Sequence, residues 1–289
     1  MEQTMERTAD LEIRELKRIA TEVRVSVIKT VHLAGAGHIG GPLSAADLLT
    51  ALYFRVMNVR PEHPDWEDRD RFVLSKGHSA IALYSVLAER GYFPKQELST
   101  FDKLDSRLQA HPDMKLLPGL DMSSGSLGQG ISAAVGMALA AKLRNKTYRT
   151  YCMVGDGESQ EGQVWEAADI ASKYGLDNLT VVLDWNQLQQ YGWKGTDGRE
   201  RRTPVEHPAE RWRAFGFHVI EIDGHDFADI LRAFEEAKAV RGKPQIIIAR
   251  TVKGKGVSFM EDSHHWHSRV PTAEELARAI NELRGGTAS

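Results

Sequence analysis

The chain has 289 residues, of which 42% are hydrophobic and 27% are charged, as is usual for a globular protein. Its formal net charge of -3 comes from acidic and basic residues that are interspersed, which argues against a basic surface for nucleic acid and against an acidic tail. We therefore expect no nucleic-acid partner, and the ligand has to be inferred from local motifs.

The N-terminus begins with acidic and polar residues instead of a basic start and an apolar stretch, so no secretory signal is predicted. The most apolar segment, 131–143, is shorter than the ~20 apolar residues that cross a bilayer. The single cysteine, Cys152, stands in an apolar run, cannot form an intrachain disulfide and fits a reducing compartment. We predict a cytoplasmic protein that makes no contact with a membrane.

Short apolar runs rich in β-branched residues alternate with longer helical patterns along the chain. The predicted strands are 71–75, 150–155, 179–184, 218–223 and 245–251. The predicted helices are 10–34, 44–56, 79–90, 128–145, 161–174, 208–215, 226–241 and 272–284. Continuous apolar strands are typical of a sheet that is buried on both faces, and the segments between them are long enough for crossover helices. The pattern predicts an α/β fold with a mostly parallel central sheet and helices on both faces.

Glycine-rich turns cluster at 35–41, 119–130 and 155–162, and a polar segment without clear periodicity runs from 186 to 207. Long loops inside compact domains are usually functional. No internal repeat, low-complexity tract or linker divides the sequence, which predicts a single domain over 1–289.

The strongest local signal follows the strand at 150–155, where Gly155, Asp156 and Gly157 lead toward a helix. In open parallel sheets the carboxyl ends of the strands are where ligands bind, and glycines let the backbone approach a phosphate closely. The next strand ends just before Asn186, so Asp156 and Asn186 are predicted to be neighbours. Carboxylate and amide oxygens suit Mg²⁺. The Gly-Asp-Gly turn alone is common for conformational reasons, and it is the following Asn that makes a metal site the better interpretation.

Four histidines stand in distinctive settings: His38 in GAGHIGGPLS, His78 in LSKGHSA, His111 in QAHPDM and His267 in HHWHSR. These strings, the segment SSGSLGQGISAAVGMALA at 123–140 and the Asp156 and Asn186 pair resemble the transketolases in order and spacing. The resemblance covers nearly the whole chain. It identifies the chain as similar to the N-terminal, diphosphate-binding subunit of a split transketolase, a glycolaldehydetransferase that moves a two-carbon ketol unit from a ketose donor to an aldose acceptor.

The resemblance implies thiamine diphosphate as cofactor and a divalent metal, Mg²⁺ or in its place Ca²⁺ or Mn²⁺. Asp156, Asn186 and the carbonyl of Leu188 occupy the positions of the metal ligands. The residues implied to contact the cofactor are His78, Gly125, Ser126, Leu127, Gly155, Gly157, Asn186 and His267. The implied catalytic residues are His38, His111 and His267, which face the reacting carbonyl and the hydroxyls of the donor sugar.

Two positions depart from the family pattern, because Ser126 stands where proline is usual and Ser268 stands where glycine is usual. His264 and His265 lie close enough in sequence to compete with His267 for its assignment. The remaining histidines, His32, His63, His207, His218 and His225, are interpreted as structural.

The family also needs a pyrimidine-binding domain with a catalytic glutamate, and this chain shows no second series of strands and helices. We expect that domain on a partner, a C-terminal transketolase subunit, in a heterotetramer of two copies of each chain. Glu161 and Glu166 match carboxylates at the family's interface and would face the partner, and ordinary exposed helix positions are the weaker alternative.

Two alternatives remain from the sequence. The α subunit of a 2-oxo acid dehydrogenase has the same Asp and Asn ligands, but the four histidine strings argue against it, and a non-catalytic scaffold subunit is disfavoured by the intact site. The donor is left open among an ordinary sugar phosphate, a branched sugar phosphate and a sulfosugar, since the arginines here lie in helical or charged runs.

Overall fold

The computed structural model describes residues 2–190, 193–194, 200–201 and 206–285, with side chains for 10–190 and 206–285. The predicted polar segment 186–207 falls partly outside these residues, and so do both ends of the predicted domain 1–289. Within the polar segment, β4 (Trp193–Lys194) pairs antiparallel with β5 (Glu200–Arg201).

The central sheet has five strands, all parallel, in the order β1-β2-β3-β7-β6. The strands are β1 (Arg71–Leu74), β2 (Thr150–Gly155), β3 (Leu179–Trp185), β6 (His218–Asp223) and β7 (Gln245–Arg250). Each matches a predicted strand to within about one residue, a smaller error than sequence patterns usually allow. The order places the carboxyl ends of β1, β2, β3 and β7 side by side at one edge of the sheet.

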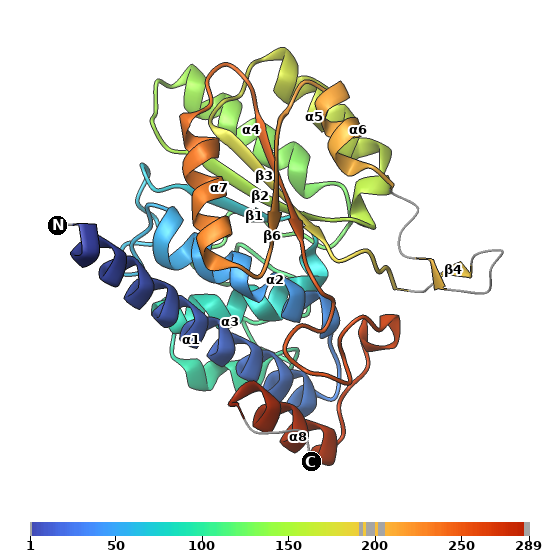
Figure 1. Cartoon of the computed structure of the whole chain (residues 1–289). Coiled ribbons are helices and arrows are strands. Elements are labelled where there is room, and N and C mark those ends of the chain that lie inside the picture. Colours follow the sequence, from blue (N-terminus) through green and yellow to red (C-terminus); the bar gives the residue numbers. More distant parts are fainter. Residues whose placement is uncertain (1, 191–192, 195–199, 202–205, 286–289) are drawn as a thin grey trace.

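Helices cover both faces of the sheet, as predicted (Figure 1). One face is packed by α4 (Gly130–Leu143), α5 (Gly162–Lys173) and α6 (Pro208–Ala214). The other face carries α7 (Phe227–Ala239) and α2 (Gly40–Ala51), with α1 (Glu2–Ala34), α3 (Ala80–Arg90) and α8 (Ala273–Leu283) packed beyond them. Each helix except α1 and α2 lies within about two residues of its predicted range, and α1 begins at Glu2 instead of the predicted 10.

The side chains of each strand alternate between two apolar cores. Tyr151 and Met153 of β2 join the cluster formed with α1, α2, α3 and α7, whereas Cys152 and Val154 join the cluster formed with α4, α5 and α6. Burying one such side chain contributes about 1.5–3 kcal/mol. The sheet is therefore held from both faces and provides a rigid base for the loops at its edge.

The second helix begins earlier than the predicted 44–56 and changes character before its end. It starts at Gly40 because proline at position 42 fits the first turn, where the amide hydrogen has no intrahelical partner. It gives way to a π-helical turn over Leu52–Val56.

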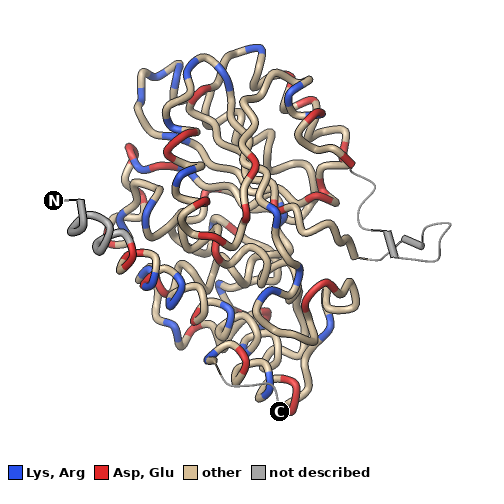
Figure 2. The backbone as a smooth tube through the Cα atoms, in the orientation of Figure 1, with Lys and Arg blue, Asp and Glu red and all other residues tan. Residues whose placement is uncertain are grey.

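Charged side chains are interspersed along the described backbone (Figure 2), in agreement with the absence of a basic stripe in the sequence. Over the part of the chain that the structure describes, no helix combines the length and the apolar character needed to cross a membrane.

Candidate functional site

A cavity of about 500 Å³ opens at the carboxyl ends of β1, β2, β3 and β7, a size typical of small-molecule sites. The predicted residues that line it are His38, His78, His111, Gly125, Leu127, Gly155, Asp156, Gly157, Glu161, Asn186, Leu188 and His267. Ser126 and Glu166 are exposed and are not part of this lining. The fold thus brings nearly all of the predicted site residues to one place.

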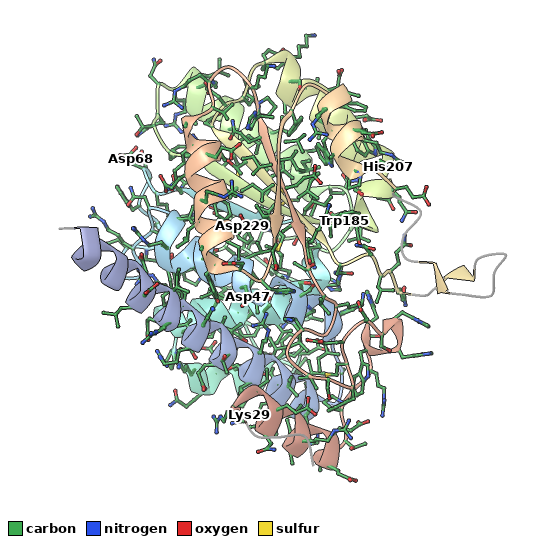
Figure 3. The ribbon with its side chains drawn as sticks, in the orientation of Figure 1. Lys29, Asp47, Asp68, Trp185, His207 and Asp229 are labelled. Carbon is green, nitrogen blue, oxygen red and sulfur yellow. The ribbon has the colours of Figure 1, made fainter. Side chains whose placement is uncertain are left out.

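Asp156 and Asn186 are brought together by the register of β2 and β3, in which Gly155 pairs with Asp184. Trp185, labelled in Figure 3, ends β3 immediately before Asn186. Backbone amides orient both side chains: Gly157 and Gln187 donate to the Asp156 carboxylate, and Leu188 donates to Asn186 Oδ1 at 3.1 Å.

The four histidines converge from four separate parts of the chain, of which three are loops and one, with His78, is the short helix η2 (Gly77–Ser79). The ring of His38 lies 5.2 Å from that of His78, 5.1 Å from that of His267 and 6.1 Å from that of His111. A backbone bond from Ile39 to the carbonyl of His267, at 3.1 Å, ties two of these loops together. The rings are thus held close enough to act on one small substrate.

Among the three histidines near 267, only His267 lines the cavity. His264 and His265 stack on each other, with ring centres 4.1 Å apart, in the short helix η5 (His264–Trp266). His267 Nδ1 lies 2.9 Å from Lys253 Nζ. An ammonium group can only donate, so Nδ1 accepts and the proton of the neutral ring is on Nε2.

Two buried lysines in this site were not predicted from the sequence. Lys76 forms an ion pair with Asp184, and both side chains are at most 2% exposed. Asp184 also accepts hydrogen bonds from Ser44 and Thr251. Lys253 donates to the carbonyls of Leu188 and Gln189, at 3.1 and 3.3 Å. The only sequence signal was position, since both lysines follow predicted strands.

Glu158 was also missed, and it fastens the glycine-rich loop over the cavity. Its buried carboxylate accepts from Ser75 Oγ at 2.5 Å and from the amides of Gly128 and Gly155 at 2.9 and 3.0 Å. A Cβ at Gly77 would lie 2.7 Å from the amide nitrogen of Gly125, so glycine is required for this close approach.

Burial and like charges dominate the electrostatics of the cavity. Burial, followed by Lys253 and His38, lowers the pKa of His267 to about 3. Burial, followed by His111 and Lys253, lowers the pKa of His38 to about 4. Burial also lowers the pKa of His78 well below its usual range. The three rings are therefore neutral at physiological pH and can each donate and accept a hydrogen bond.

Asp156 and Lys253 also line the cavity, and their charged forms are disfavoured as well. Burial, followed by the nearby Asp184, raises the pKa of Asp156 to about 6. Burial lowers the pKa of the Lys253 ammonium to about 8. Over the described part of the chain, no three His, Cys, Asp or Glu side chains are grouped as a ready metal site. Any cation at Asp156 thus depends on amide, carbonyl and ligand oxygens for the rest of its coordination.

Comparison with known proteins shows which family this site belongs to. Residues 15–285 match the family described as "Transketolase, thiamine diphosphate binding domain". The chain is 44% identical to the 6-deoxy-6-sulfo-D-fructose transketolase subunit of a Clostridium species, over 93% of this chain and 96% of the relative. It is 41% identical to an apulose-4-phosphate transketolase subunit of Phocaeicola vulgatus, over 94% of this chain and 95% of the relative.

Full-length transketolases match over less than half of their own length. The chain is 41% identical to transketolase from Homo sapiens, covering 93% of this chain and 42% of that protein. It superposes on the crystal structure of transketolase from Campylobacter jejuni with a TM-score of 0.86 and 35% identity, over 96% of this chain and 44% of that one. The chain therefore belongs to the transketolase family and forms its thiamine diphosphate-binding domain.

Proposed function

We propose that this chain is the diphosphate-binding subunit of a two-chain transketolase, which transfers a two-carbon ketol unit and is active only with its partner. The observation that carries the proposal is the meeting of Asp156, Asn186 and Leu188 with four histidines around one cavity. When bound, thiamine diphosphate supplies the electron sink for breaking the ketose carbon–carbon bond. The residues of this chain bind and orient the cofactor and the substrate, and they exchange protons with them.

Asp156, Asn186 and the carbonyl of Leu188 fit a divalent metal, and Mg²⁺ is our first choice over Ca²⁺ or Mn²⁺. All three supply oxygen, which both magnesium and calcium prefer. Two backbone amides orient the Asp156 carboxylate and a third orients Asn186, so the oxygens are fixed in advance. A bound cation would also stabilise the ionised Asp156 carboxylate and so offset the cost of burial that raises its pKa.

The same cavity fits a diphosphate. The Lys253 ammonium supplies a buried positive charge, and Gly155 and Gly157 have no side chains to keep a phosphate away from the backbone. Gln189 lines the cavity, and its Nε2 is buried without a hydrogen-bond partner among the described residues, so an anion would satisfy this atom. We assign His78 and His267 to the diphosphate as well, and Gly125, Ser126 and Leu127 to the organic part of the cofactor.

The neutral histidines suit proton exchange with the substrate. The rings of His38 and His267 meet edge to face, with their planes at 90°. Both residues are assigned to the reacting carbonyl. His111 lies farther out, against Gly125, and is assigned to the hydroxyls of the donor sugar. A neutral imidazole donates and accepts at once, as a group that moves a proton between oxygens must.

The partner is assigned to the open side of the cavity. Leu127 and Glu161 are exposed at its rim, and Glu166 and Ile170 are exposed on the adjoining helix α5. We assign Glu161 and Glu166 to the contact with a C-terminal subunit that brings the pyrimidine domain and its catalytic glutamate. A heterotetramer of two copies of each chain is the assembly we expect.

The sugar substrate is the least determined part of the proposal. Two similar subunits are named for 6-deoxy-6-sulfo-D-fructose and for apulose-4-phosphate. The histidines of this chain gather around the cavity near the first carbons of a donor, where ketoses are alike. Recognition of a distal phosphate or sulfonate calls for arginine, and we assign it to the partner.

The test is reconstitution of this chain with its partner subunit, thiamine diphosphate and Mg²⁺. We expect transfer of a two-carbon unit from a ketose to an aldose without gas release. Release of carbon dioxide from a 2-oxo acid would instead support an α subunit of a 2-oxo acid dehydrogenase. Cofactor binding without either reaction would support a non-catalytic subunit.

A further inference from the structure

A buried polar cluster lies outside the cavity, between α1, α2 and the turn that joins β6 to α7. Arg24 donates two hydrogen bonds to the Asp47 carboxylate, at 2.9 and 2.6 Å, and a third to the carbonyl of Leu43. Asp47 lies on α2 below α7 in the view of Figure 3. His225 Nδ1 lies 2.7 Å from Asp47 Oδ2, and the His225 side chain is 12% exposed. We refer to Arg24, Asp47 and His225 as the clamp.

The hydrogen bond at the second ring nitrogen of His225 fixes the tautomer of the ring. His225 Nε2 lies 2.9 Å from the amide nitrogen of Val252. A backbone amide only donates, so Nε2 must be the unprotonated acceptor and Nδ1 must carry the proton that is donated to Asp47. The ring therefore links the Asp47 carboxylate to one backbone amide through two directional bonds.

That amide belongs to the residue immediately before Lys253. On the other side of Lys253, the amide of Gly254 donates to the carbonyl of Gly40 at 3.0 Å. A Cβ at Gly40 would lie 2.9 Å from the Lys253 side chain, so the start of α2 and Lys253 are in close contact. Gly40 and Asp47 are seven positions apart on α2, about two turns, and hence share one face of that helix.

We propose that His225 is a positioning residue, which, with α2 as a rigid support, holds the 252–254 segment so that the Lys253 ammonium stays in the cofactor cavity. Two backbone amides that flank Lys253 are held, one by the Gly40 carbonyl of α2 and one by His225 Nε2, and Asp47 of α2 orients the His225 ring. Lys253 itself is buried, and its hydrogen-bond partners among the described residues are two carbonyls and His267. Its stem has four rotatable bonds, so its position depends on a fixed backbone. The proposal rests on the proposed role of Lys253 at the diphosphate.

Two conservative substitutions separate the two bonds of the imidazole. An asparagine amide reaches about as far as Nδ1, so H225N keeps a donor for Asp47 and loses the acceptor for Val252. A glutamine reaches about as far as Nε2, so H225Q keeps an acceptor for Val252 and loses the donor. The bond to Val252 is the one that holds the segment, and the backbone of residue 225 stays anchored in either variant because its amide donates to the Asp223 carboxylate at 2.8 Å. The positioning role therefore predicts that H225Q resembles the wild type and that H225N does not.

The first readout is site-resolved hydrogen exchange on the full chain without ligand. We expect H225N to speed exchange at the Val252 amide about tenfold, which corresponds to the loss of about one hydrogen bond. H225Q should stay within about threefold of the wild type. Equal exchange in all three proteins would overturn the proposal. If H225N does not fold, H225Q still decides, because loss of Val252 protection in that variant contradicts the proposal.

The second readout is the dissociation constant for thiamine diphosphate with Mg²⁺, measured by calorimetry on the chain together with its partner. We expect H225N to weaken binding about tenfold and H225Q to change it little. H218N is the matched control, because His218 begins β6, the strand that leads into the turn with His225, but pairs with exposed Glu236. Equal weakening by H225N and H225Q, or equal weakening by H218N, would contradict a positioning role.

A third variant separates this proposal from the proposed function. K253M should weaken cofactor binding directly. If K253M binds the cofactor as tightly as the wild type, the role of Lys253 at the diphosphate is wrong. The exchange data still decide independently whether His225 holds the 252–254 segment.

Discussion

Two groups of buried ionisable side chains behave in opposite ways in this protein. In the clamp, burial acts to raise the pKa of Asp47, but Arg24 and His225 outweigh it and lower that pKa to about 2. In the cavity, like-charged neighbours add to burial, so that Lys253 and His38 further lower the pKa of His267. The clamp is satisfied by its own chain, whereas the charged forms of His267, Asp156 and Lys253 in the cavity are disfavoured without a ligand.

The difference separates groups that maintain the fold from groups that serve a ligand. A buried ion pair loses 3–5 kcal/mol, roughly, when one partner is removed, because the other charge remains buried and unpaired. A group whose charge is already disfavoured by burial costs little stability when it is neutralised. Substitutions in the clamp should therefore change stability, and substitutions in the cavity should change binding or turnover.

The largest effect is expected in the clamp. R24M leaves the Asp47 carboxylate buried beside only His225, and we expect the free energy of unfolding to fall by about 3–5 kcal/mol. Urea unfolding of the ligand-free chain measures this. Arg18 on the same helix is the matched control, because its pair with Glu15 is largely exposed, and R18M should leave the unfolding midpoint nearly unchanged. A loss below about 1 kcal/mol in R24M would remove the contrast between the two groups.

At the metal position the effect should shift from stability to binding. D156N keeps the shape of the side chain but removes the charge, and we expect cofactor binding with Mg²⁺ to weaken at least about 100-fold by calorimetry. Because the folded-state pKa of Asp156 is raised to about 6, its ionisation destabilises the ligand-free fold, with the full effect above that pH. The ligand-free variant should therefore be no less stable than the wild type at neutral pH. An unchanged affinity of D156N for the cofactor with Mg²⁺ would contradict the metal assignment.

Substitutions of the histidines separate substrate contacts from cofactor contacts within the cavity. H38A and H111A should lower turnover about 100-fold while cofactor affinity stays within about threefold, because their assigned partners are substrate atoms. H78A should weaken the cofactor as well. Steady-state kinetics combined with calorimetry separates the two outcomes. Equal loss of cofactor in all three variants would show that this division of roles is wrong.

The smallest effect is expected at Lys253, with opposite signs for stability and binding. Its folded-state pKa of about 8 lies below its usual value of 10.5, so the charged form destabilises the ligand-free fold fully below pH 8 and ceases to do so above about 10.5. K253M should raise the ligand-free melting temperature at pH 7 and weaken the cofactor about tenfold. A wild type that gains no stability relative to K253M between pH 7 and 10 would contradict this account.

The sheet and the strand-end ligands were accessible to sequence reasoning because they depend on local pattern. The β-branched runs predict all five strands, and Asp156 and Asn186 follow two of them directly. Parallel pairing then brings their side chains to one edge whatever the rest of the fold does. The histidines were found from a resemblance, since nothing in a single sequence shows that His38 and His267 meet.

The buried lysines could not be predicted because their environment is made by distant parts of the chain. Lys76 is buried by its pairing with Asp184, 108 positions away. Lys253 lies in a glycine-rich and lysine-rich run that a sequence pattern assigns to solvent. His225 was interpreted as structural, and the structure places it in the clamp, where its two bonds depend on α2 and on the segment after β7.

The order of the strands also has a consequence for how the protein folds. Arg71 of β1 pairs with Thr150 of β2, about 80 positions later along the chain. Closing so long a segment is entropically costly, and such non-local pairing is typical of slow folding steps. His78, His111 and Gly125 all lie in this segment, so the cavity is complete only after β1 has joined the sheet. We expect the ligand contacts to form after the folding transition state, so that thiamine diphosphate slows unfolding and leaves the folding rate nearly unchanged.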